Sequence, residues 1–134
     1  MAKRSSGELP SQRQLRVGEQ MRHLLADWLV RGEIHDPRLD GVSVTVSEVR
    51  VSPDLREAKA FVSELGRSLS AEVAAALRAA APQLAGRLAR AMHLKYAPRL
   101  RFVADTSFEE ADRIERLLKA ERARLKAEEG GETA

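Results

Sequence analysis

The sequence has no cysteine, which excludes a disulfide framework and a thiolate metal site. It also has no apolar run near the roughly 20 residues that a membrane-spanning helix needs. The basic start, Met1 to Arg4, is followed by polar residues rather than by the apolar core of a secretory signal. We therefore expect a cytoplasmic protein, in agreement with a reducing compartment.

Aromatic residues are scarce as well, with one Trp, one Tyr and three Phe in 134 residues. Trp28 and Phe102 fall at predicted core positions, so too few rings remain for a base-stacking platform. Phosphate-binding glycine loops, dinucleotide glycine patterns and nucleophile elbows do not occur. The sequence therefore gives no support for an enzyme.

A metal site is not predicted either, because the three histidines lack ligand spacing. A carboxylate cluster of Asp36, Asp54 and Asp105 is an alternative, but each of these residues has a plainer position in a loop, a turn or a helix start. We expect no metal and no cofactor.

What the sequence does have is segregated charge. The net charge is only +3, yet residues 73–104 hold no acidic side chain. The basic residues of this stretch are Arg78, Arg87, Arg90, Lys95, Arg99 and Arg101. Such a local positive field is typical of proteins that bind a polyanion, above all a nucleic acid. Chance clustering in an arginine-rich chain is the alternative.

The first half of the chain predicts a helix and a hairpin. Apolar residues at helical spacing cover residues 12–31, and Arg13 and Arg16 lie beside this stripe as a second basic patch. Alternation then predicts strands over residues 42–51 and 56–63, joined by a proline turn. The alternation changes phase near residues 47–48, which indicates a bulge.

The second half predicts two helices around a kink, a strand and a last helix. Pro82 inside a helix costs about 3 kcal/mol, but it fits the first turn of a new helix. We therefore predict a helix–kink–helix at Ala80-Ala81-Pro82, with the second helix over residues 82–94. Residues 100–104 alternate as a third strand. The expected buried face of the last helix is Ile114, Leu117, Leu118 and Leu125.

The resulting order, α-β-β-α-α-β with an added C-terminal helix, predicts an α+β protein with a KH-like (type II) domain. A three-stranded sheet covered by helices is its core. We expect a disordered segment over residues 1–10, the domain over 11–126 and an acidic disordered tail over 127–134. No sustained heptad or large apolar surface argues for an oligomer, so we expect a monomer.

A usual KH domain clamps single-stranded RNA with a Gly-x-x-Gly loop between its two central helices. Ala80-Ala81-Pro82 stands in that place here, so we expect recognition of a folded RNA by charge and shape. Gly86, on the exposed side of the second helix, either permits close approach of a backbone or is a tolerated glycine costing about 1 kcal/mol.

The domain resembles the ribosome-binding factor A family over roughly residues 12–120. The matching segments are Arg16-Val17, Asp36-Pro37-Arg38-Leu39, Val44-Thr45-Val46, Val49-Arg50-Val51-Ser52-Pro53-Asp54-Leu55, Ala58-Lys59-Ala60-Phe61-Val62-Ser63, Pro98-Arg99-Leu100-Arg101-Phe102, Asp105 and Ser107. The family's Ala-x-Gly kink signature corresponds to Ala80, Ala81 and Pro82, so proline replaces the glycine.

This resemblance implies a factor that binds the immature small (30S) ribosomal subunit and its 16S ribosomal RNA and assists late maturation and processing of that RNA. It also implies a link to cold adaptation and release by an assembly GTPase. Our hypothesis is a non-catalytic placeholder on the RNA. The residues expected to contact RNA are Arg13, Arg16, Arg78, Arg87, Arg90, Lys95, Arg99 and Arg101. A protein–protein adaptor is the alternative, and a metal-dependent nuclease a more distant one.

Overall fold

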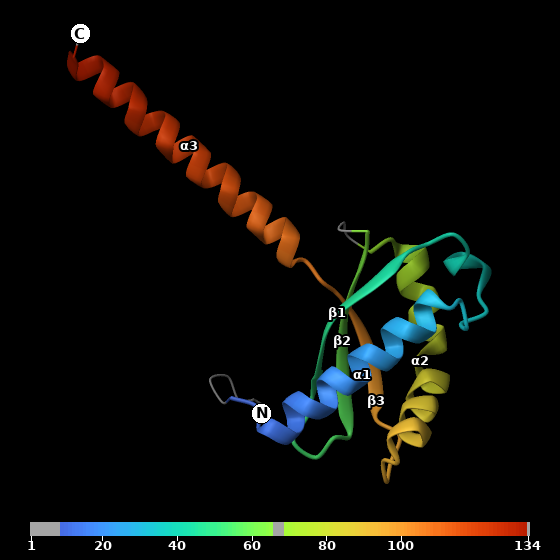
Figure 1. The fold of residues 1–134 in the computed structure, drawn as a ribbon. Coiled ribbons are helices and arrows are strands. Elements are labelled where there is room, and N and C mark those ends of the chain that lie inside the picture. Colours follow the sequence, from blue (N-terminus) through green and yellow to red (C-terminus); the bar gives the residue numbers. More distant parts are fainter. Residues whose placement is uncertain (1–8, 66–68, 134) are drawn as a thin grey trace.

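The structure is a computed structural model that describes residues 9–65 and 69–133. Most of the expected disordered segment, residues 1–8, lies outside the described residues. The elements in chain order are α1 (Gln12–Val30), η1 (Pro37–Leu39), β1 (Val44–Val51), β2 (Glu57–Glu64), α2 (Ala71–Met92), β3 (Arg99–Ala104) and α3 (Ser107–Thr133). The protein is thus α+β, as predicted, and Figure 1 shows the arrangement of its elements.

The sheet has the strand order β1-β2-β3. β1 and β2 form the predicted antiparallel hairpin, and their register shifts between Val46 and Glu48, where the change of phase indicated a bulge. β3 pairs with β2 in parallel. A parallel pair needs a long crossover connection, and α2 provides it.

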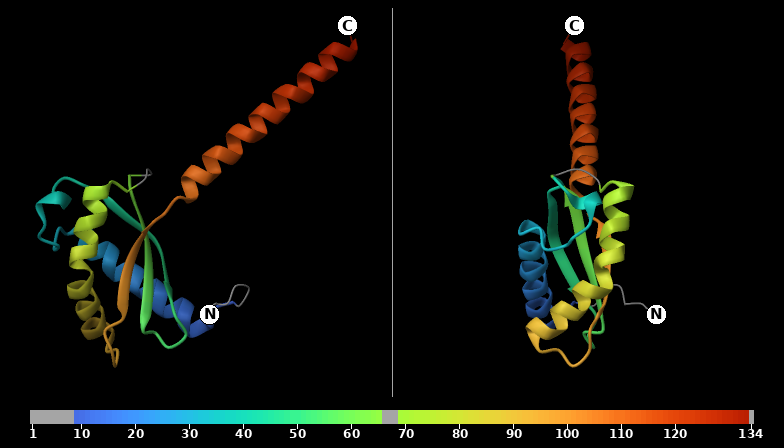
Figure 2. Two further views of the ribbon diagram at one scale, coloured as in Figure 1. Left: turned by 180° about the vertical axis from the view of Figure 1, so that it is seen from behind. Right: turned by 90° about the vertical axis from the view of Figure 1, so that its right-hand side faces the viewer.

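One face of the sheet is covered by helices and the other is open. α1 packs against β1, and α2 packs against β3. When the molecule is viewed from behind, the strands lie in front of α1 and no helix crosses them (left view of Figure 2). The core therefore lies between the sheet and α1 and α2. Its largest fully buried side chains are Met21, Leu25, Leu77, Leu88 and Val62.

Gly18 sets the distance between α1 and β1. It is a buried helix residue, and a Cβ atom placed on it would overlap the carbonyl oxygen of Val49. Only glycine leaves room for the helix backbone to approach the strand this closely.

α2 is one continuous helix, where the sequence predicted two helices joined at a kink. Ser70 caps its start, Pro82 lies inside it, and His93 ends it in a left-handed conformation. The helix bends midway along its length, so the kink is present without a break (right view of Figure 2). Proline removes only one backbone hydrogen bond. Buried residues on both sides of it, Leu77 and Leu84 among them, hold the two halves against one core.

α3 also differs from its prediction. Ile114, Leu117, Leu118 and Leu125 were expected to be buried, but 47% to 64% of each side chain is exposed. Figure 1 shows the reason, because α3 extends away from the domain. The helix continues to Thr133, so the described part of the expected disordered tail is helical. Among the described residues, no helix combines the length and the apolarity that crossing a membrane requires.

Candidate nucleic-acid interface

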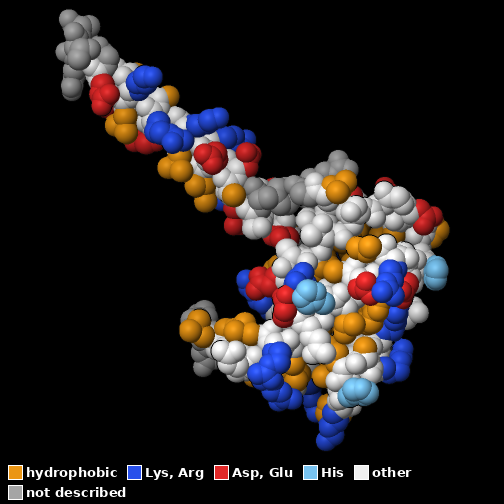
Figure 3. Space-filling model, in the orientation of Figure 1, with side chains coloured by type: hydrophobic (Ala, Val, Ile, Leu, Met, Phe, Trp, Pro, Cys, Tyr) orange, Lys and Arg blue, Asp and Glu red, His pale blue; other side chains and the backbone are white. Residues whose placement is uncertain are grey.

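Basic side chains gather at one end of the domain. The N–H group of Arg99 donates to the carbonyl oxygen of Arg56 at 2.7 Å, which joins the start of β3 to the β1–β2 turn. The amide of Gln14 donates to the carbonyl oxygen of Val51 at 3.0 Å, which brings the start of α1 to the same end. Figure 3 shows Lys and Arg side chains gathered over this lower end of the domain, and others along α3.

Tyr96 is the centre of this basic end, which we define as Arg56, Lys95, Tyr96 and Arg99. The guanidinium carbon of Arg56 lies 4.2 Å from the centre of the Tyr96 ring, and the Lys95 Nζ atom lies 5.5 Å from it. The ring is still 49% exposed. A half-exposed ring next to two cations can contact a base while the cations contact phosphates.

The basic end also contains carboxylates. Asp54 accepts hydrogen bonds from the Ser52 hydroxyl at 2.7 Å and from the Arg56 N–H at 3.1 Å, and these bonds lower the pKa of Asp54. Glu57 is exposed at the start of β2. The positive potential here is therefore an excess of cations rather than an absence of acids.

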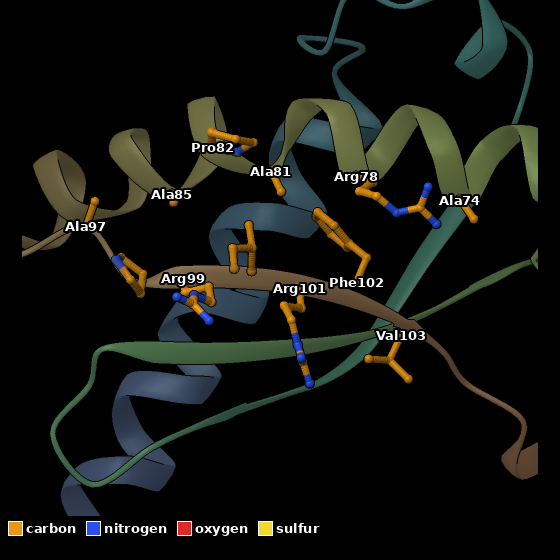
Figure 4. A pocket seen from close by; sticks show the side chains of 12 residues that line it. Ala74, Arg78, Ala81, Pro82, Ala85, Ala97, Arg99, Arg101, Phe102 and Val103 are labelled. Carbon is orange, nitrogen blue, oxygen red and sulfur yellow. The ribbon is translucent and has the colours of Figure 1, made fainter.

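A groove of about 690 Å³ runs between α2 and β3. Its wall on α2 includes Ala81, Pro82 and Ala85, and Arg78 stands on the same side. Arg99 and Arg101 line it from β3. In Figure 4, Phe102 points toward α2, whereas Arg101 points to the opposite side of β3. The structure thus brings Arg78 and Arg99 together along one groove, whereas the Arg101 side chain leaves the groove for the opposite side of β3.

Other predicted residues lie on nearby exposed surfaces. Arg13 and Arg16 are exposed in the first turns of α1, and Arg90 is exposed in the last turn of α2. In the predicted kink motif, Ala80 is half-buried, Ala81 is buried and Pro82 is exposed.

Arg87 has an internal role that the sequence did not indicate. Its Nη2 atom donates to Glu33 at 2.6 Å, and its guanidinium carbon lies 4.1 Å from the centre of the Trp28 ring. Only 29% of its side chain is exposed. The charge of Arg87 is therefore already balanced inside the domain, in contrast to that of Arg90.

The three aspartates considered as a metal cluster have the separate local roles that the sequence indicated. Asp36 accepts hydrogen bonds from the side chain and N–H group of Arg38, which lower the pKa of Asp36 to about 2. Asp105 accepts from the N–H group of Ser107 at the start of α3. Within residues 9–65 and 69–133, no three His, Asp or Glu side chains form a group that could hold a metal ion.

Arg56 and Lys59 are basic residues that the sequence reasoning missed. They lie outside the acid-free stretch, which drew attention to residues 73–104. Strand pairing places them beside β3, because Arg56 directly precedes the Glu57–Arg99 pair and Lys59 is opposite Arg101. Only the parallel register carries this information.

Comparison with known proteins gives one family. The model of the family described as ribosome-binding factor A matches residues 13–118. A ribosome-binding factor A from Paracoccus denitrificans (strain Pd 1222) is 53% identical over 123 residues, which are 92% of this chain and 89% of the relative. Another, from Cereibacter sphaeroides (strain ATCC 17029 / ATH 2.4.9), is 49% identical over 133 residues, or 98% and 97% of the two chains.

Solved structures agree with this family. The crystal structure of ribosome-binding factor A from Thermus thermophilus superposes with a TM-score of 0.55 at 29% identity, covering 68% of this chain and 94% of the other. A homology model of the Thermus thermophilus factor, fitted into a cryo-EM map of its 30S complex, has a TM-score of 0.54 at 28% identity. It covers 66% of this chain and 91% of its own.

Proposed function

Because the chain belongs to the ribosome-binding factor A family, we propose that it binds the immature 30S subunit through its 16S ribosomal RNA. In this proposal it assists late maturation and processing of that RNA by non-catalytic binding, as a cytoplasmic monomer. The Thermus thermophilus relative, which is described in a 30S complex, supports the choice of partner. Cold adaptation and release by an assembly GTPase belong to the same proposal, on the family resemblance alone.

The observation that carries the proposal is the convergence of cations at the basic end and along the groove between α2 and β3. Arg78 lines the groove from α2 and Arg99 lines it from β3, while Arg101 lies on the same strand with its side chain on the opposite side. Arg90 and Lys95 extend this surface around the end of α2, and Arg13 and Arg16 extend it onto α1. Cations spread over a groove and its rim suit the phosphates of a folded RNA, which are recognised by charge and shape.

The first test is sedimentation of the protein with 30S subunits, 50S subunits and whole ribosomes at two salt concentrations. We expect salt-sensitive binding to the 30S subunit alone. The R90E variant should bind more weakly, with a log–log salt slope flatter by roughly 0.7–0.9. R31E is the matched control, because it changes the net charge by the same amount outside the assigned surface. Arg31 lies at the C-terminal end of α1, where it pairs with Asp27.

Two results would contradict the proposal. Equal binding to all particles would indicate only a generic basic protein. If R90E and R31E weakened 30S binding equally, the assignment of Arg90 to the RNA-binding surface would be wrong. The circular dichroism spectrum of each variant verifies that the fold is intact.

A protein–protein adaptor is the second candidate, and α3 is the observation that favours it. This helix carries the exposed apolar side chains of Ile114, Leu117 and Leu118, and such surface is what an adaptor presents to a partner. An adaptor predicts 30S binding that depends weakly on salt and is lost when α3 is removed.

A further inference from the structure

The open face of the sheet carries a row of three cations. Arg50 on β1 lies opposite Lys59 on β2, and Lys59 lies opposite Arg101 on β3. All three residues are exposed, while their strand neighbours Val49, Ala58 and Leu100 are buried on the covered face. Neighbouring strands are about 4.8 Å apart, so three positive charges cross the sheet side by side.

This row is unfavourable for the isolated protein, because like charges directly opposite each other on neighbouring strands destabilise a sheet. Arg50 is partly compensated, since it pairs with Glu48 at 2.8 Å and lies 4.8 Å from the centre of the Phe61 ring. Neither Lys59 nor Arg101 has an ion-pair partner within residues 9–65 and 69–133. An external anion is what would relieve the repulsion.

The surroundings of the row suit an extended anion rather than a small one. Outward positions of the strands hold four cations, the row and Arg99, against the carboxylates of Glu48 and Glu57. None of the helices in the described part of the chain covers this face (Figure 2), and Arg101 extends away from α2 over it (Figure 4). A flat face with cations spaced across three strands matches a sugar–phosphate backbone, which presents repeated charges along a line.

We propose that this open face binds the sugar–phosphate backbone of a second ribosomal RNA segment, apart from the segment bound at the groove and the basic end. The inference rests on the proposed function and deepens it. β3 stands between the two surfaces, since Arg99 and Arg101 line the groove and also carry the positive edge of the open face. The protein then holds two RNA segments on either side of one strand.

The first experiment compares stability with binding in the variants K59E and E57Q of the full chain. K59E replaces the middle cation, so it should raise the thermal midpoint at low salt while it weakens 30S binding several-fold. E57Q removes a carboxylate that lies where the open face meets the basic end, so it should strengthen binding at either surface and verifies the sign of the charge effect. Opposite effects of K59E on stability and on binding are the signature of a ligand site. A loss of stability in K59E, or unchanged binding, overturns the proposal.

The second experiment identifies the ligand. A benzophenone side chain at position 59 or at position 95 is irradiated with the 30S subunit, and adducts on 16S RNA are mapped by reverse transcription. We expect RNA adducts from both positions, at different segments. If position 95 reacts with RNA while position 59 reacts with protein or not at all, the inference fails and the proposed function stands. If the unaltered protein does not bind the 30S subunit, both fail.

Discussion

The missing side chain of Gly18 allows α1 to pack directly against β1. Its Cα atom lies so close to β1 that a methyl group would overlap the Val49 carbonyl oxygen, and backbone atoms cannot move aside as a side chain does. We expect G18A to lower the free energy of unfolding by about 1–3 kcal/mol, despite the better helix propensity of alanine. Urea denaturation measures this loss as a lower midpoint with an unchanged slope.

Gly86 is the matched control. A Cβ atom there meets only the Nη1 atom of Arg90, at 3.4 Å, so G86A should be about 0.5–1 kcal/mol more stable than the unaltered protein. A G18A protein of full stability would contradict the close approach of α1 to β1. Binding of G86A to the 30S subunit decides between the two interpretations of this glycine, since only a close backbone approach makes the added methyl group harmful.

Local sequence patterns predicted buried residues of the domain, but they could not predict contacts between residues far apart in the sequence. The buried stripe containing Trp28 and the bulge near residue 47 follow from local periodicity, and the structure has both. The pairing of Arg87 with Glu33 joins residues 54 positions apart, so no local pattern contains it. An arginine in an acid-free stretch therefore looked free although a distant carboxylate balances it.

At the scale of elements, Asp105 links the sheet to α3. Its carboxylate accepts from the Ser47 hydroxyl at 2.5 Å and from the N–H group of Ser107 at 2.9 Å. These bonds favour the charged form, so the pKa of Asp105 lies below its usual value of about 3.9. The stabilisation is present above that usual value and is lost as the pH falls through the lowered pKa.

We expect S47A to raise the pKa of Asp105, because the hydrogen bond from Ser47 is the largest cause of its lowering. A carbon-13 NMR titration of the side-chain carboxyl measures this value. Asp54 is the internal control, because its pKa is lowered by Ser52 and should not respond to S47A. An unchanged Asp105 titration in S47A would show that the bond between β1 and Asp105 is absent in solution.

Some helices and strands could be predicted from local sequence patterns, and others could not. The hairpin and β3 were predictable because alternation identifies a strand wherever one face is buried. The exposure of α3 was not predictable. An apolar stripe shows which side of a helix is hydrophobic, but it does not show whether another element covers that side. The continuity of α2 through Pro82 depends on the core that holds both halves, and the sequence around the proline does not contain that information.

For the whole molecule, the domain should be independent of α3. A chain that ends at residue 106 lacks side chains that are mostly exposed, so its thermal midpoint should differ by less than about 2 °C. Circular dichroism at 222 nm follows this transition, and the helical signal before unfolding should fall with the loss of α3. A clearly lower midpoint would mean that α3 packs on the domain or on a second copy in solution.

The parallel pairing of β3 with β2 has a consequence for synthesis of the chain. About forty residues separate the end of β2 from the end of β3, and translation at 5–20 residues per second needs about 2–8 s to add them. During that interval the hairpin can form, but the edge of β2 that β3 will occupy has no partner. An unpaired edge recruits strands from other chains. The nascent protein is therefore most prone to aggregate in the interval before β3 pairs with β2.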